Sequence, residues 1–183
     1  MVRTETPICE FDLPAIDFSL KGVDDQYYDL NSLKGENGLL IMFICNHCPY
    51  VKSIISRIIR DTSELKQAGI NSVGIMSNDQ TEYEEDSFEN MKKMALSNNF
   101  PFPYLVDETQ EVARAYGAVC TPDFFGYNNK LGLQYRGRLD ESRKESVDGA
   151  KRELFEAMKQ ISRTGRGPDH QIPSMGCSIK WFE

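Results

Sequence analysis

An unbroken apolar segment that ends on a cysteine constrains this fold more than any other part of the chain. Residues 39–44 read LLIMFI, without the alternation of a half-buried strand, so they predict a central strand buried on both faces. The sequence CNHCP follows at positions 45–49, and apolar residues then recur at helical spacing across 51–65. Proline is tolerated in the first turn of a helix because it lacks only a donor that would be unpaired there. The pattern therefore predicts a buried strand, a pair of cysteines and a helix in succession.

Periodicity and turn residues divide the rest of the chain into alternating strands and helices. Strands are expected at 70–76 and 104–106 and helices at 88–96, 108–116 and around 150–161, with hairpins formed by 18–20 with 26–30 and by 123–127 with 133–138. Asp107 is expected to cap the helix that Gly117 ends. This order predicts an α/β fold, with a layered sheet and helices on both faces.

The length of 183 residues predicts one domain, 1–183, in which 166–183 form a tail. Trp181 and Phe182 are expected to dock this tail on the body, because exposed apolar ends are unusual.

Charge and composition exclude several classes of function. The formal net charge is -7 and basic residues form no stripe, so partners such as nucleic acid or anionic lipid are not expected. The N-terminus lacks a basic start followed by an apolar stretch, and the longest apolar run is too short to span a bilayer. The sequence therefore predicts a cytoplasmic protein without a membrane partner.

Five cysteines in a chain without an export signal indicate chemistry or metal binding rather than a disulfide framework. At a helix N-terminus, backbone N-H groups and the helix dipole stabilise a thiolate. The loop is expected to leave Cys45 accessible for attack and Cys48 shielded, as the resolving thiol. His47 between them would add positive charge and lower the pKa of Cys45.

Cys45 and Cys48 have two other interpretations. They could be inert core residues, although a strand-to-helix loop is a poor place for these. They could bind zinc, but His170 stands alone, and Cys120 and Cys177 lack a partner at ligand spacing. No metal or cofactor is therefore expected.

The order of strand, C-x-x-C, helix and a later Thr-Pro before a hairpin resembles the thioredoxin superfamily. The runs MFICNHCPYVK, VCTPDFF, YRGRLDESR and PSMGCSIKW resemble its peroxiredoxin-like branch, grouped with the alkyl hydroperoxide reductase and thiol-specific antioxidant (AhpC/TSA) family. The resemblance implies a thioredoxin-like fold with a central mixed sheet, Cys45 as nucleophile and Cys48 as resolving thiol. It also implies a cis bond between Thr121 and Pro122, which would turn the Thr121 backbone toward the sulfurs, where an extended substrate could pair.

Two positions and one missing motif depart from the patterns of these families. Ile44 replaces a tryptophan of thioredoxins, and Leu39 replaces a buried aspartate that moves a proton for the inner cysteine, so His47 or water would have to serve as base. The peroxiredoxin pattern P-x-x-x-T-x-x-C is absent before both Cys45 and Cys48.

The positions of further residues predict supporting or auxiliary roles. Asn46 and His47 are expected to support the cysteines. Cys120, Cys177 and Arg138 are possible auxiliary residues: Cys120 at the rim of the site or as a buried thiol, Cys177 through a docked tail, and Arg138 by steadying a thiolate or by belonging to a solvated charged cluster. The cluster comprises Arg136, Arg138, Asp140 and Arg143. Cys9 is interpreted as incidental, and the acidic residues 81–90 as a solvated stretch before a helix.

The leading predicted function is thiol-disulfide exchange by Cys45 and Cys48, with protein or small-molecule disulfides as substrates and a reductase or thiol system as electron source. One alternative is thiol-dependent peroxide reduction through a sulfenic acid on Cys45. The other is a non-enzymatic redox-sensing or metal-handling module.

Overall fold

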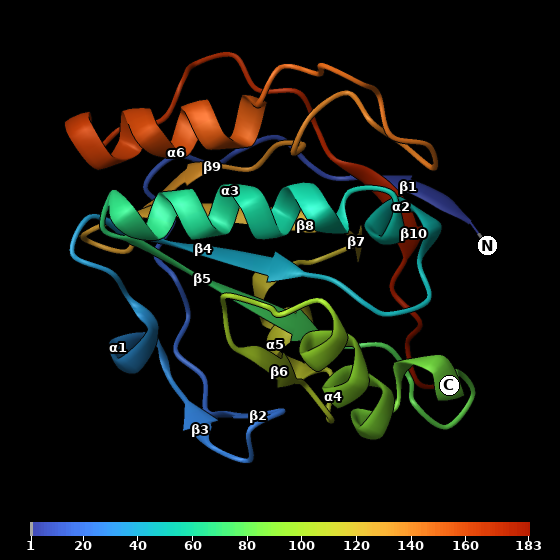
Figure 1. The fold of residues 1–183 in the computed structure, drawn as a ribbon. Coiled ribbons are helices and arrows are strands. Elements are labelled where there is room, and N and C mark those ends of the chain that lie inside the picture. The colour runs from blue at the N-terminus through green and yellow to red at the C-terminus, as the bar shows by residue number, and fades with distance from the viewer. Residues whose placement is uncertain (1) are drawn as a thin grey trace.

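The main sheet of this computed structural model, which describes residues 2–183, has mixed strand directions (Figure 1). Within the described residues its strands lie in the order β3 (Tyr27–Tyr28), β2 (Leu20–Gly22), β6 (Tyr104–Val106), β5 (Ile70–Met76), β4 (Gly38–Phe43), β8 (Asp123–Asn128) and β9 (Leu133–Tyr135). Strands β4, β5 and β6 are parallel neighbours, and the other pairs are antiparallel. The predicted α/β thioredoxin-like fold with a central mixed sheet is confirmed.

Strand β4 carries side chains into both cores, as its unbroken apolar sequence predicts. Leu40 and Met42 belong to one buried cluster, and Leu39, Ile41 and Phe43 belong to the other. The first cluster includes residues of α3 (Ile55–Gln67), α4 (Phe88–Ser97) and α6 (Glu153–Thr164), and the second those of α1 (Leu30–Leu33) and α5 (Glu111–Tyr116). Helices therefore cover both faces of the sheet, and Figure 1 shows α3 and α6 on the same side of β4.

The helix predicted after the cysteines is interrupted. Helix α2 covers Pro49–Lys52 and has Ser53 as its C-cap, and α3 begins at Ile55. The Ser53 hydroxyl donates to the carbonyl oxygens of Tyr50 and Arg143, and Ile54 leaves the helical region with φ -119° and ψ 3°. A serine that bonds to neighbouring backbone competes with the helix, which accounts for the break.

Other element boundaries differ by a few residues from those predicted. The first hairpin is β2 with β3, two residues later in its first strand, and β9 ends at Tyr135 rather than at 138. Helix α5 starts at Glu111 rather than 108 because Gln110 adopts a left-handed conformation, while Asp107 still accepts a bond from the Ala113 N-H. Gly117 ends that helix at φ 65°, as predicted. Helix α6 starts at 153 rather than near 150.

The C-terminal segment is built into a second sheet. Strand β10 (Met175–Ser178) lies between β1 (Arg3–Glu5) and β7 (Cys120–Thr121), antiparallel to both. Beyond it, the Arg114 guanidinium stacks over the Trp181 ring at 4.3 Å, whereas Phe182 is 43% exposed. A short 3-10 helix, η1 (Glu84–Asp86), precedes α4. No helix in residues 2–183 has the length and apolar character that crossing a bilayer requires.

Candidate active site

The cysteine motif occupies a buried loop between β4 and α2. Helix α2 begins at Pro49, and its N-cap is Cys48, so the helix N-terminus lies next to Cys48 and not next to Cys45. Cys45 is 1% exposed and Cys48 is fully buried. The prediction of an accessible Cys45 at the start of the helix is therefore wrong, because the loop folds under the residues that surround it.

Thr121 contacts both sulfur atoms of the motif. Its hydroxyl lies 3.4 Å from the Cys45 sulfur, and its carbonyl oxygen lies 3.2 Å from the Cys48 sulfur. The bond between Thr121 and Pro122 is cis, as the resemblance implied. The motif and the Thr-Pro dipeptide, far apart in sequence, thus meet as predicted.

The pKa values of the two thiols are shifted in opposite directions. The Cys45 thiol donates a hydrogen bond to the Cys48 sulfur, and together with donors from Cys177 and Thr121 this lowers the pKa of Cys48 to about 5. The same bond to Cys48, burial and the charge of Asp86 raise the pKa of Cys45. The Thr121 carbonyl favours protonated Cys48, but one acceptor is outweighed by these donors. The sequence prediction of a lowered Cys45 pKa is therefore reversed.

Thiolate absorbance measured against pH is expected to show a step near pH 5 in the reduced protein, because the folded pair stabilises the Cys48 thiolate. Cys48→Ser should remove this step, whereas Cys45→Ser should keep it, since a serine hydroxyl can still donate to Cys48. Cys9→Ser is the control, because burial raises the pKa of that thiol to about 11. Loss of the step in Cys45→Ser alone would place the thiolate on Cys45.

A buried carboxylate, Asp86, organises the loop. It accepts from the backbone N-H groups of Asn46 at 2.7 Å and His47 at 3.2 Å, and its second oxygen lies 2.5 Å from His47 Nδ1 and 2.9 Å from Asn78 Nδ2. Burial opposes ionisation of Asp86, but the bonds from His47 and Asn78 lower its pKa, and the bond to Asp86 raises the pKa of His47. The positive charge of the His47 imidazolium is thus paired with the negative charge of Asp86. The effects of the two charges on the pKa of Cys45 therefore oppose each other.

The side chains of Asn46 and His47 are held from several directions. Asn46 donates to the Glu85 carbonyl and accepts from the Tyr104 hydroxyl at 2.9 Å. The His47 ring stacks on Tyr83, with centroids 5.3 Å apart. These contacts place both side chains beside the cysteines, and their supporting role stays a prediction. The prediction of a solvated stretch at residues 81–90 is wrong at Asp86, which is fully buried.

Donor atoms of Cys45, His47 and Asp86 all lie within 4.8 Å of one another and could together hold a metal ion. However, the short hydrogen bond between His47 and Asp86 joins two of the three donor atoms. A cation bound by both would have to displace that proton and separate the two side chains. The set fits a hydrogen-bonded pair beside a thiol better than a preformed metal centre.

The auxiliary residues proposed from the sequence lie in different surroundings. The Cys177 sulfur is 3.0 Å from that of Cys48, so β10 brings this thiol into the site. The Cys120 thiol instead faces the Pro122 carbonyl at 3.6 Å, and burial raises its pKa. The Arg138 guanidinium donates two hydrogen bonds to the carboxylate of Glu153, the first residue of α6. Cys9 packs against the second core cluster.

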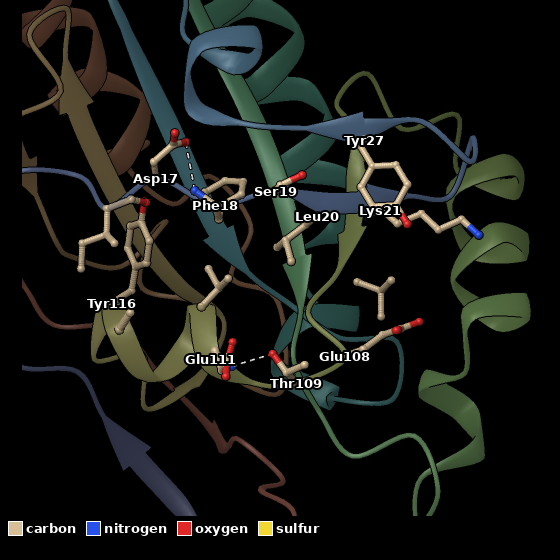
Figure 2. Close-up of a pocket in the computed structure, with 14 residues that line it drawn as sticks. Asp17, Phe18, Ser19, Leu20, Lys21, Tyr27, Glu108, Thr109, Glu111 and Tyr116 are labelled. Atoms are coloured by element: carbon tan, nitrogen blue, oxygen red, sulfur yellow. Dashed lines mark hydrogen bonds between the residues drawn. The ribbon is translucent and has the colours of Figure 1, made fainter.

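A large surface cavity lies away from the sulfur atoms. It has a volume of about 470 Å³. The segment leading into β2 and helix α5 border it (Figure 2). Leu20, Lys21 and Tyr27 come from the N-terminal hairpin, and Glu111 and Tyr116 from the helix. Its lining residues include no cysteine or histidine. The cavity therefore offers none of the chemistry found around Cys45 and Cys48.

The three buried cysteines at the end of the central strand and the family match together define a thiol redox protein. The AhpC/TSA family matches residues 12–142. The chain belongs to the AhpC/TSA family.

Solved structures extend this comparison. An uncharacterized conserved protein from Geobacillus kaustophilus is 43% identical, with a TM-score of 0.93 over 100% of this chain and 97% of that one. A hypothetical protein from Sinorhizobium meliloti 1021 is 32% identical, with a TM-score of 0.91 over 98% of both chains. Peroxidoxin BcpB from Mycobacterium tuberculosis shares the fold, at 16% identity and a TM-score of 0.63 over 86% of this chain and 99% of that one. No curated protein sequence matches the chain.

Proposed function

We propose that this chain is a thiol-disulfide oxidoreductase in which Cys45 and Cys48 alternate between a dithiol and a disulfide. The observation that carries the proposal is the meeting of both sulfurs at Thr121, whose hydroxyl lies 3.4 Å from the Cys45 sulfur and whose carbonyl oxygen lies 3.2 Å from the Cys48 sulfur. The lowered pKa of Cys48 supports the proposal. A thiolate next to a second thiol is the arrangement that disulfide exchange needs.

The proposed reaction begins when Cys45 passes its proton to Cys48 and the resulting Cys45 thiolate attacks a substrate disulfide. A Cys45-substrate disulfide forms, the substrate sulfur-sulfur bond breaks, and the first leaving group takes the proton from Cys48. Cys48, again a thiolate, then attacks the Cys45 sulfur and releases the second substrate sulfur as a thiolate, which takes a proton from water. The low pKa of Cys48 makes it a ready resolving nucleophile, so the absence of a carboxylate at Leu39 does not prevent this step.

The test compares an insulin-type disulfide and hydrogen peroxide as substrates for the same purified protein, with a thiol reductant and matched protein-free reactions. Turnover of the disulfide, and a much slower reaction with peroxide, is expected. Faster turnover of peroxide would replace the proposal with peroxide reduction. Zinc bound in the purified protein, without turnover of either substrate, would favour a metal-handling role.

A further inference from the structure

Strand β10 occupies the backbone edge at which an extended substrate was expected to pair. Cys177 lies opposite Thr121 and Ser178 opposite Cys120 in the antiparallel register of β10 with β7. On its other side β10 pairs with β1. A protein segment could therefore pair with Thr121 only after β10 had left both neighbouring strands.

The close approach of β10 to the site depends on a glycine. A Cβ atom placed on Gly176 would overlap the carbonyl oxygen of Thr121. With no side chain there, β10 packs tightly against β7 and sets the Cys177 sulfur 3.0 Å from that of Cys48. Two sulfur atoms at this separation need to move by only about 1 Å to form a bond.

Cys177 also borders a surface cavity of about 530 Å³, whose lining includes neither Cys45 nor Cys48. This volume suits a small molecule. The walls carry three cationic side chains, Arg3, Arg143 and Lys144, and two acidic ones, Glu141 and Glu145, with the Tyr50 ring beside them. Burial and the neighbouring Cys48 raise the pKa of Cys177 to about 12, and the positive charges of Lys180 and Lys144 oppose this rise. The cavity thus places a net positive lining beside Cys177, which is itself 3% exposed.

We propose that Cys177 is a third redox thiol, which passes electrons to the Cys45-Cys48 disulfide from a low-molecular-weight thiol that carries a carboxylate and binds in this cavity. The proposal rests on the proposed function of the Cys45-Cys48 pair. It names a small thiol rather than a protein as reductant, because β10 already fills the strand-pairing edge.

Each step exchanges one sulfur-sulfur bond for another. Cys177 attacks the Cys48 sulfur, the Cys48-Cys177 bond forms, the Cys45-Cys48 bond breaks, and Cys45 leaves and takes up the proton that Cys177 loses. The external thiol then attacks Cys177, loses its proton to Cys48 and displaces that sulfur. A second external thiol attacks the sulfur of the first, leaving Cys177 as a thiol. Two external thiols are thereby oxidised to one disulfide, and the protein disulfide is reduced to two thiols.

This relay of electrons through Cys177 can be tested after the full chain has been oxidised with diamide. Diamide forms the Cys45-Cys48 disulfide whether or not the protein accepts a substrate disulfide. Re-reduction by glutathione, an acidic thiol, is compared with re-reduction by neutral 2-mercaptoethanol. Cys177→Ser should slow reduction by glutathione at least tenfold. Gly176→Ala, which keeps every sulfur but displaces β10, should also slow it. Lys144→Gln should slow glutathione more than 2-mercaptoethanol. Cys9→Ser is the control that should reduce at the wild-type rate.

Peptide mapping provides a second measurement. In diamide-treated Cys45→Ser, a disulfide between Cys48 and Cys177 is expected. Wild-type rates of glutathione reduction in Cys177→Ser, or Cys177 remaining a thiol in oxidised Cys45→Ser, would overturn the relay. Absence of a Cys45-Cys48 disulfide in oxidised Cys177→Ser would contradict the proposed function instead, while mapping of Cys45→Ser would still decide whether Cys48 and Cys177 react.

Discussion

Replacement of either Cys45 or Cys48 with serine is expected to reduce disulfide exchange to the rate of the protein-free reaction. A serine hydroxyl does not ionise near neutral pH and cannot form a sulfur-sulfur bond, so neither variant can complete the cycle. The rate is measured by reduction of an insulin-type disulfide in the presence of excess thiol. Cys9→Ser, which changes a half-buried cysteine outside the site, should retain the wild-type rate.

The two variants are expected to differ in what they trap. Cys48→Ser should accumulate mixed disulfides on Cys45, because the sulfur that resolves them is gone. In Cys45→Ser the attacking sulfur is absent, so no mixed disulfide should form. Adding Cys177→Ser removes the sulfur, 3.0 Å from that of Cys48, that could otherwise resolve one before it is detected. Non-reducing gels and mass spectrometry report the trapped species. Trapping in Cys45→Ser combined with Cys177→Ser, and not in Cys48→Ser, would show that Cys48 attacks first.

The fold was predictable from the sequence because its central elements leave local signals. The apolar run at β4 must be buried on both faces, and the spacing of Ile58 and Leu65 directs one side of α3 to the core. Three strands of two to four residues, β1, β7 and β10, leave no such signal. Strands β1, β7 and β10 form a sheet only because segments from the two ends of the chain meet, and no periodicity in three or four residues indicates that meeting.

The site was predictable only where a motif marks it. Cys45, Cys48 and the Thr121-Pro122 dipeptide stand out in the sequence, and the structure brings them together. Asp86 lies among other acidic residues, and only its packing under Asn46 and His47 distinguishes it from exposed Glu84 and Glu85. The sign of the Cys45 pKa shift could not be predicted either, since it depends on the hydrogen bond with Cys48, on burial and on the charge of Asp86.

Asp86→Asn is expected to destabilise the folded protein by about 3–5 kcal/mol, the usual cost of removing one partner of a buried charge pair. The asparagine amide would present a donor where the carboxylate accepts from two side chains, His47 and Asn78. The His47 imidazolium would lose its counter-ion, so its pKa should fall. Urea unfolding gives the free energy, and NMR titration of the imidazole gives the pKa.

The pH dependence of this destabilisation follows from the two pKa shifts. The pKa of His47 is raised above 6.5, so its stabilising contribution is complete below that pH and is lost as the pH rises through the folded value. The pKa of Asp86 is lowered below 3.8, so its contribution is present above that pH and is lost as the pH falls through the folded value. The difference in unfolding free energy between wild type and Asp86→Asn should therefore be largest between about pH 4 and 6.5. Glu85→Gln removes the same charge from the adjacent exposed residue and should leave stability within about 0.5 kcal/mol of wild type. Equal destabilisation by both variants, or a stable Asp86→Asn protein with an unchanged His47 pKa, would show that the carboxylate does not hold the loop through His47.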